Sequence, residues 1–132
     1  MSPEDHYFSP AGPRVLAHRG LALEAPENTL LAFAHALALG VEYLETDVHA
    51  SADGVAMVAH DPDLSRVLGR PEKISDLSAA ELGALDLGNG QHMPTLAEAL
   101  DAFPDARFNV DLKAAEAVPS AVEMIVSQRA ER

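Results

Sequence analysis

Strand-like and helix-like segments alternate along this chain, and this alternation limits the possible folds more than any other feature of the sequence. The apolar run at 15–17 predicts a buried strand that ends in a loop. Apolar residues at helical spacing follow over 30–38, with Asn28 as the expected N-cap and Gly40 as the stop. Residues 41–48 then predict a second strand. Strands that alternate with helices indicate a parallel α/β sheet.

The alternation returns in the carboxy-terminal third of the chain. A capping-box pattern that starts at Thr95 predicts a helix ending by Pro104. Residues 108–113 predict a third strand, because apolar and polar residues alternate there. A further capping-box pattern, which starts at Ser120, predicts the last helix.

Residues 53–93, called the excursion below, interrupt this pattern. Asp53 and Gly54 form a tight-turn signal that sends 55–60 back antiparallel to the strand before it. The rest is punctuated by proline and glycine, with a short helix expected after Ser78. The sequence therefore predicts an insertion after the second strand of the parallel sheet.

Three carboxylates lie on two of the predicted strands. Glu45 and Asp47 are two residues apart, so both side chains project to the same side of their strand. Their mutual repulsion is of the kind that a bound hard cation relieves. Asp111 on the third strand offers a further oxygen, and such a donor set suits Mg²⁺ or Ca²⁺. The alternative is that all three are solvent-facing strand residues without a ligand.

Two histidines follow short apolar runs. His18 and His60 are each succeeded by a charged residue, and a pair of imidazoles can act as general base and general acid around one phosphorus atom. Arg19 could clamp a phosphate oxygen, and Lys113 could add a second positive charge. For either histidine alone, the alternative is a hydrogen-bonded structural residue.

Seven short motifs occur in a fixed order between about residues 14 and 126. They are His-Arg-Gly at 18–20, Pro-Glu-Asn-Thr at 26–29, Glu-Thr-Asp-Val at 45–48, Asp-Gly at 53–54, His-Asp at 60–61, Pro-Thr-Leu at 94–96 and Asn-Val-Asp-Leu-Lys at 109–113. Their order and spacing resemble the glycerophosphodiester phosphodiesterase family. Phospholipase-D-like toxins also use paired histidines and a Glu/Asp metal site, but the Pro-Glu-Asn-Thr and Pro-Thr-Leu motifs favour the first family.

The resemblance implies a (β/α)₈ barrel with a small insertion after the second strand. It also implies metal-dependent hydrolysis of a glycerophosphodiester to glycerol 3-phosphate and an alcohol, through a cyclic phosphate that water opens. The site residues that it implies are the acid/base pair His18 and His60, the phosphate contacts Arg19 and Lys113, and the ligands Glu45, Asp47 and Asp111 of a divalent cation, Ca²⁺ or Mg²⁺. Asp111 stands where glutamate is frequent in the family, and because aspartate is one methylene shorter, ligation there is expected to be looser or bridged by water. The alcohol remains open among choline, ethanolamine, glycerol and inositol.

The length of the chain does not match a whole barrel. It has 132 residues, whereas a (β/α)₈ barrel typically needs ~250. We expect a leader over 1–13 and, over 14–132, a partial barrel that contains about the first three β/α units. Such a piece leaves open sheet edges, as expected of a shortened gene product or one part of a split enzyme. The alternative function is a non-catalytic partial barrel that self-associates or complements a missing carboxy-terminal half.

Composition excludes several classes of protein. A net charge of −12 argues against binding nucleic acid or anionic membranes through a broad basic surface. The chain has no cysteine, so it has neither a disulfide framework nor a thiolate zinc site. No apolar run approaches ~20 residues, and the first residues do not resemble a secretory signal. We therefore expect a cytoplasmic protein with a small-molecule substrate and no membrane span.

Overall fold

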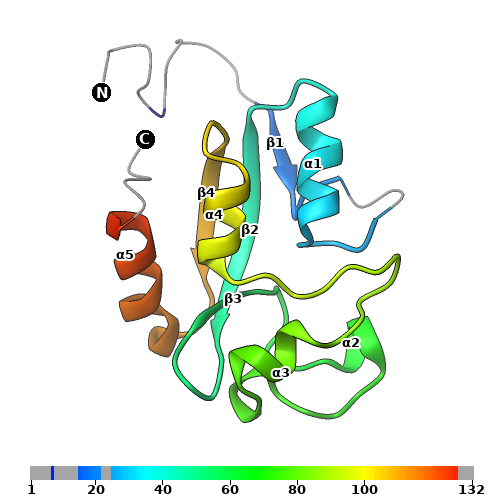
Figure 1. The fold of residues 1–132 in the computed structure, drawn as a ribbon, viewed down its shortest axis with the longest axis vertical. Helices are drawn as coiled ribbons and strands as arrows, with labels where there is room; N and C mark the ends of the chain where they lie inside the picture. The colour runs from blue at the N-terminus through cyan, green and yellow to red at the C-terminus, as the bar shows by residue number, and fades with distance from the viewer. Residues whose placement is uncertain (1–6, 8–14, 22–24, 128–132) are drawn as a thin grey trace.

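One mixed sheet organises the computed structural model, which describes residues 7, 15–21 and 25–127. Its strands are β1 (Leu16–His18), β2 (Tyr43–Ala50), β3 (Ala56–Val58) and β4 (Arg107–Leu112). The central strand β2 pairs in parallel with β1 on one edge and with β4 on the other, and β3 pairs antiparallel with the end of β2 (Figure 1). The predicted parallel sheet and the predicted hairpin arm are therefore confirmed. Among the described residues the sheet is not closed.

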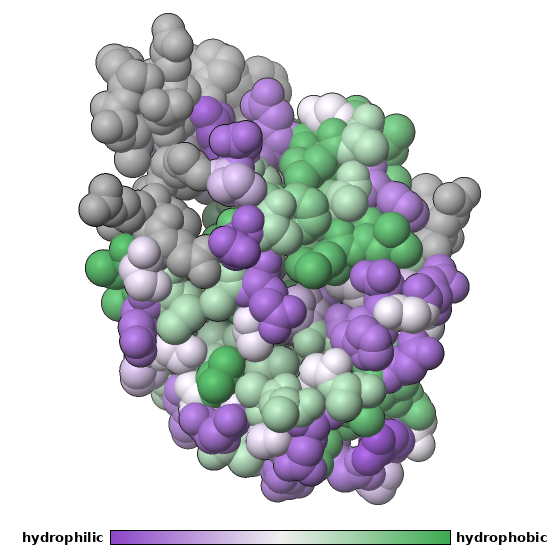
Figure 2. All heavy atoms as spheres, in the orientation of Figure 1, coloured by the Kyte–Doolittle hydropathy of each residue, from purple (hydrophilic) through white to green (hydrophobic). Residues whose placement is uncertain are grey.

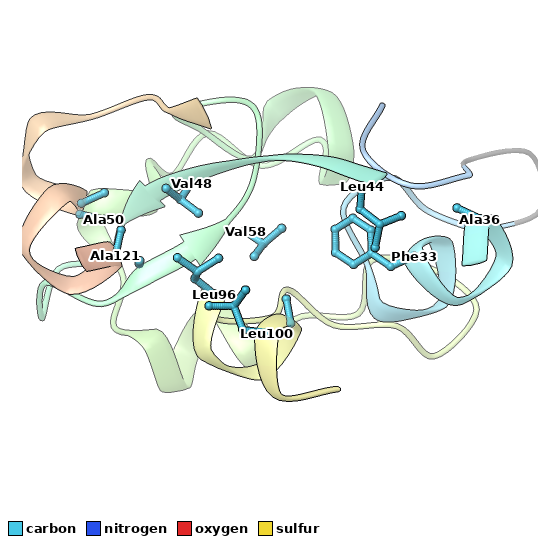
Figure 3. Close-up of a cluster of buried hydrophobic side chains, with 12 residues drawn as sticks. Phe33, Ala36, Leu44, Val48, Ala50, Val58, Leu96, Leu100 and Ala121 are labelled. Atoms are coloured by element: carbon cyan, nitrogen blue, oxygen red, sulfur yellow. The ribbon is translucent and has the colours of Figure 1, made fainter. Parts of the chain in front are cut away.

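Three helices pack against the face of β2 that carries Leu44 and Val48. They are α1 (Leu30–Ala38), α4 (Leu96–Ala102) and α5 (Val118–Ser127), the last preceded by the 3₁₀ turn η3 (Ala115–Ala117). Figure 3 shows the side chains of Leu44 and Val48 directed towards residues of α1 and α4. The buried ring of Phe33 meets Phe103 and Phe108 edge-on, with ring centres 6.3 and 5.6 Å away. This face is therefore a continuous apolar core, and the opposite face is free to carry polar groups.

The excursion has secondary structure and an apolar cluster of its own. It contains α2 (Ser65–Leu68), the 3₁₀ turn η2 (Ile74–Asp76) and α3 (Ala79–Gly83). Ser78 and Glu81 form the predicted capping box, each side chain accepting a hydrogen bond from the other's backbone N–H. The cluster consists of Met57, Leu64, Ile74, Leu82 and Met93. The excursion is therefore held together by its own apolar cluster. Its elements α2 and η2 were not predicted from the sequence.

Two predicted helix starts were wrong. Thr29, not Asn28, caps α1, because its hydroxyl accepts a hydrogen bond from the N–H of Ala32 at 3.2 Å. Asn28 has a left-handed backbone with φ of 55°, and its side chain contacts β2 instead. Likewise α5 begins at Val118 and not after Ser120.

The early start of α5 follows from Pro119. A proline is tolerated in the first turn of a helix, where its missing N–H has no intrahelical acceptor. The hydroxyl of Ser120 is engaged elsewhere, since it accepts a hydrogen bond from the N–H of Ala56 at 2.9 Å. Ser120 therefore ties α5 to β3 and does not cap the helix.

The prediction that β1 is buried was also wrong. Val15 and Leu16 are 71% and 40% exposed, because β1 has a sheet neighbour on only one edge within the described residues. The predicted leader lies outside the described residues except for Tyr7, whose ring contacts Tyr43 edge-on at 5.2 Å. Within the described ranges, no helix has the length and apolar character needed to cross a membrane.

Candidate active site

The topology brings the candidate residues to one edge of the sheet. Parallel strands end at the same edge, and the register sets His18 of β1 opposite Glu45 of β2. On the other side of β2, Asp111 of β4 stands opposite Asp47, and Lys113 follows the end of β4. In α/β folds this edge, at the carboxyl ends of the strands, is where ligands bind.

Glu45 and Asp47 form a pair of carboxylates with little access to solvent. Their side chains are 17% and 2% exposed. Burial raises the pKa of the Glu45 carboxyl above its ordinary value, and the negative charge of Asp47 raises it further. Two crowded carboxylates of this kind fit a hard divalent cation, because its charge removes the repulsion between them.

Asp47 is the centre of a small group of donors. Arg19 Nε and Lys113 Nζ each lie 3.8 Å from one of its carboxylate oxygens. The side-chain amide of Asn28 donates to the same carboxylate at 3.5 Å and accepts from the hydroxyl of Thr46 at 2.8 Å. Asn28 therefore uses its left-handed backbone to reach β2 and to orient Asp47.

The third predicted ligand is engaged by a lysine. The carboxylate of Asp111 lies 2.8 Å from Lys113 Nζ, and this hydrogen bond raises the pKa of the lysine. The Asp111 side chain is 54% exposed, unlike that of Asp47. Over residues 7, 15–21 and 25–127, no group of three or more histidine, aspartate or glutamate side chains is arranged to hold a metal ion. Glu45 and Asp47 lie on one side of β2 and Asp111 lies opposite Asp47 on β4, and the roles of all three as metal ligands stay predictions.

Arg19 adopts a backbone conformation that is uncommon for a residue with a side chain. Its φ is 55°, and its N–H donates to the backbone carbonyl of Glu45 at 2.8 Å. Nη1 donates to Glu27 at 3.0 Å, whereas Nε is buried and makes no hydrogen bond to the described residues. A buried guanidinium N–H without a hydrogen bond is a ready donor for a phosphate oxygen.

The two histidines have different surroundings. His18 Nε2 lies 3.6 Å from a carboxylate oxygen of Glu45, and the imidazole is 67% exposed. His60 Nδ1 donates to Asp61 Oδ1 at 2.8 Å, and the carbonyl of His60 accepts a hydrogen bond from His49 Nε2 at 2.9 Å. His60 is thus held on both its side chain and its backbone, while His18 is open to an incoming ligand.

Three further residues connect the predicted ones and were missed from the sequence. Glu27 accepts hydrogen bonds from Arg19 and Arg66, and Asp61 accepts from His60 and Arg66. Burial acts to raise the pKa of Glu27, but the hydrogen bonds and charges of Arg66 and Arg19 outweigh it and lower the pKa. With these links, all seven predicted residues belong to one connected set of hydrogen bonds and ion pairs.

Only part of this network had a signal in the sequence. Glu27 lies in the Pro-Glu-Asn-Thr motif, which has a sufficient explanation as the start of a helix. Asp61 directly follows His60 in the sequence, but adjacency alone does not show which groups a carboxylate contacts. Arg66 lies on a helix that periodicity does not predict, so nothing in the sequence indicated it.

A cavity of about 580 Å³ lies beside Lys113. Its wall includes His49 and Ser51 at the end of β2, together with Lys73 and Ser75 from the excursion. This volume is within the range of small-molecule sites, about 300–1,000 Å³. A ligand whose anionic group contacts Lys113 therefore has room for the rest of its structure in this cavity.

Comparison with known sequences identifies relatives of the chain. A family model described as "Glycerophosphoryl diester phosphodiesterase family" matches residues 18–131. A probable glycerophosphodiester phosphodiesterase of Mycobacterium tuberculosis is 38% identical over 125 residues, which are 94% of this chain and 47% of that protein. A human lysophospholipase D is 39% identical over 111 residues, covering 74% of this chain and 35% of that protein. The chain therefore spans about half, or less, of the length of these relatives.

Solved structures show the same partial correspondence. A putative glycerophosphoryl diester phosphodiesterase from Silicibacter pomeroyi superposes with a TM-score of 0.84 at 30% identity, over 92% of this chain and 56% of that one. A phosphodiesterase from Oleispira antarctica, solved with the product sn-glycerol-3-phosphate, gives 0.82 at 33% identity, over 88% and 53%. The parallel β/α sheet described above thus corresponds to about half of the barrel in these structures.

Proposed function

The chain belongs to the glycerophosphoryl diester phosphodiesterase family, and from this premise we propose that its site hydrolyses a glycerophosphodiester to glycerol 3-phosphate and an alcohol. The observation that carries the proposal is the single network, completed through Glu27, Arg66 and Asp61, that contains both histidines, both cations and all three carboxylates predicted from the sequence. The Oleispira antarctica relative, which was solved with sn-glycerol-3-phosphate, supports this choice of product.

Arg19 and Lys113 bind the phosphate in this proposal. Nε of Arg19, which makes no hydrogen bond to the described residues, donates to one phosphate oxygen, and Lys113, which borders the cavity, contacts another. Both cations already lie 3.8 Å from Asp47, so the phosphate enters a site whose positive charges are in place before it arrives. The alcohol portion then extends into the cavity next to Lys73.

Glu45 and Asp47 are the proposed ligands of a divalent cation, Ca²⁺ or Mg²⁺, with Asp111 as the third ligand. Burial and the negative charge of Asp47 both raise the pKa of Glu45, and a divalent cation bound between the two carboxylates would offset both effects, which supports this assignment. When bound, the cation neutralises negative charge at the phosphate and favours ionisation of the attacking hydroxyl.

His18 and His60 move the protons. One imidazole takes the proton of a glycerol hydroxyl as its oxygen attacks phosphorus, and the other gives a proton to the departing alcohol. A P–O bond forms and a P–O bond breaks, which leaves a cyclic phosphate. Water then opens the ring with the two imidazoles exchanging roles, and glycerol 3-phosphate is released. The ionised Asp61 beside His60 stabilises that imidazole when it holds a proton.

Release of glycerol 3-phosphate tests the proposal directly. The chain is incubated with glycerophosphocholine or glycerophosphoinositol, with Ca²⁺, with Mg²⁺ or with a chelator. Because the chain spans about half of its relatives, each assay is repeated with the carboxy-terminal half of the Mycobacterium tuberculosis relative added. We expect metal-dependent release in at least one arm. Absence of release in every arm would refute the proposal.

Substitutions separate catalysis from metal binding. We expect His18→Ala and His60→Ala to abolish turnover while Ca²⁺ binding, measured by calorimetry, is retained. His35→Ala, which changes a histidine in the last turn of α1, is the matched control and is expected to leave both unchanged. Loss of Ca²⁺ binding in a histidine variant would contradict the assigned roles.

An exposed apolar stripe on α5 favours one second candidate, a non-catalytic unit that self-associates. Val118, Val122 and Val126 recur every four residues and are 39%, 51% and 59% exposed. Figure 2 shows apolar side chains at the surface over α1 and at the edge formed by α5. Sedimentation distinguishes the two candidates, because a compact monomer across the micromolar range would exclude self-association.

A further inference from the structure

Arg66 occupies an unusual place for a residue of a surface excursion. It lies on α2, a helix of four residues, and its side chain is 49% exposed. It nevertheless contacts two carboxylates from separate segments: Nη1 contacts Glu27 Oε1, and Nε donates to Asp61 Oδ2 at 2.6 Å. A planar guanidinium can hold two carboxylates in a fixed relation, which the point charge of a lysine cannot do.

Each of the two carboxylates uses its other oxygen on a predicted site residue. Asp61 Oδ1 accepts from His60 Nδ1 at 2.8 Å, and Glu27 Oε2 accepts from Arg19 Nη1 at 3.0 Å. Arg66 therefore stands at the middle of an unbroken row of contacts between the imidazole of His60 and the guanidinium of Arg19. The row joins the loop after β1 to the segment after β3.

Contacts within the excursion fix the backbone that carries Arg66. Leu64, immediately before α2, is fully buried in the apolar cluster of the excursion. Asp63 accepts hydrogen bonds from the N–H and the hydroxyl of Ser65 at 3.0 and 2.6 Å, which sets the first turn of α2. The excursion thus presents Arg66 to the site from a fixed position.

We propose that Arg66 is a positioning residue: through Asp61 it holds His60 in the tautomer with a proton on Nδ1, and through Glu27 it orients Arg19. The consequence for chemistry rests on the function proposed above. With Nδ1–H donated to Asp61, the lone pair of neutral His60 lies on Nε2, the nitrogen left for a substrate proton. The excursion then completes the catalytic arrangement from a part of the chain outside the parallel sheet.

The first test does not depend on activity. Protein labelled with ¹⁵N in histidine is studied by long-range ¹H–¹⁵N NMR at about pH 8, where ordinary histidines are neutral. His60→Gln identifies the resonances of His60. We expect the Nδ1–H form in the natural protein and a shift toward the Nε2–H form in Arg66→Met. Arg66→Lys keeps the positive charge but loses the planar guanidinium. Its fraction of His60 in the Nδ1–H form is therefore expected to lie between those of the natural protein and Arg66→Met.

Arg70→Met is the matched control. Arg70 belongs to the same excursion, is 43% exposed and pairs with Glu72, which is not one of the carboxylates that Arg66 contacts. Neither arginine is buried, so urea unfolding midpoints of Arg66→Met and Arg70→Met are expected to match within error. A tautomer shift in Arg66→Met alone supports the proposal, and an unchanged His60 tautomer in Arg66→Met overturns it.

Kinetics provide the second test. In whichever form hydrolyses glycerophosphodiesters, Arg66→Met is expected to lower kcat by about 10- to 100-fold through misplacement of His60 and Arg19, with Arg70→Met unchanged. An unchanged kcat in Arg66→Met also overturns the proposal. If the natural protein hydrolyses nothing, the proposed function fails, while the tautomer measurement still decides whether Arg66 positions His60.

Discussion

Replacing Asp47 by asparagine is expected to destabilise the folded chain far more than replacing Asp111, although Asp111 lies nearer to the lysine that both contact. Lys113 Nζ is 2.8 Å from Asp111 and 3.8 Å from Asp47. The difference lies in burial, since the two carboxylate side chains are 54% and 2% exposed. Exposed ion pairs contribute little to stability, because water and salt screen them.

The size of the Asp47 effect follows from its pair with Arg19. At 3.8 Å and an effective dielectric constant of about 20, the attraction is about 4 kcal/mol. Removing one partner of a buried pair typically costs about 3–5 kcal/mol, and the loss falls toward the lower end here because Arg19 keeps its ion pair with Glu27. Relief of the repulsion with Glu45 subtracts from this loss. We therefore expect a net loss near the lower end, about 3 kcal/mol.

Urea unfolding without divalent cations measures both variants. With a slope of about 2 kcal/mol per molar urea, a loss of 3 kcal/mol lowers the midpoint of Asp47→Asn by about 1.5 M. The midpoint of Asp111→Asn is expected to stay within experimental error of the natural chain. Equal shifts in the two variants would show that proximity to Lys113, and not burial, decides the contribution, and would refute this reasoning.

Two further predictions concern Gly20 and Glu45. Gly20→Ala is expected to lower the urea midpoint more than Gly54→Ala. Both glycines have a φ near +78°, which costs alanine about 1–2 kcal/mol at either position. Of the two, only Gly20 would place its new Cβ against backbone, 2.7 Å from the carbonyl carbon of Ala32. Equal shifts would show that the close approach to α1 is unimportant. The raised pKa of Glu45 means that the folded chain binds more protons there than the unfolded chain, so stability falls as pH rises from 4.5 through the raised value. Glu45→Gln is expected to remove this fall in stability, measured by urea titrations between pH 4 and 8. Saturating Ca²⁺ is expected to stabilise the natural chain and not the variant. Parallel pH curves for the two proteins would contradict the assignment.

The sequence predicted the elements that depend on periodicity. Alternation of apolar residues located β2 and β4, and with them the common side of Glu45 and Asp47 and the position of Asp111. Turn chemistry at Asp53 and Gly54 located the antiparallel arm. These patterns are local, so they are visible without any tertiary contact.

The failures share a tertiary cause. Asparagine is a common N-cap residue, but contacts with Thr46 and Asp47 hold Asn28 in a left-handed conformation, and Thr29 caps α1 instead. Ser120 likewise bonds to β3 instead of starting α5. Arg66 gains its partners only when the segments after β1 and β3 meet, which no local pattern encodes.

The 3₁₀ turn η2 both packs into the apolar cluster of the excursion, through the fully buried Ile74, and borders the cavity. Ile74 fixes the backbone of the turn in the apolar cluster of the excursion, while its neighbours Lys73 and Ser75 border the cavity beside Lys113. Under the proposed function, exchanges at these two positions would change the charge and shape of the cavity wall that faces the alcohol, while the sheet and its carboxylates stay as they are. The cavity wall of the excursion could therefore vary in sequence without altering the packing that supports Glu45 and Asp47.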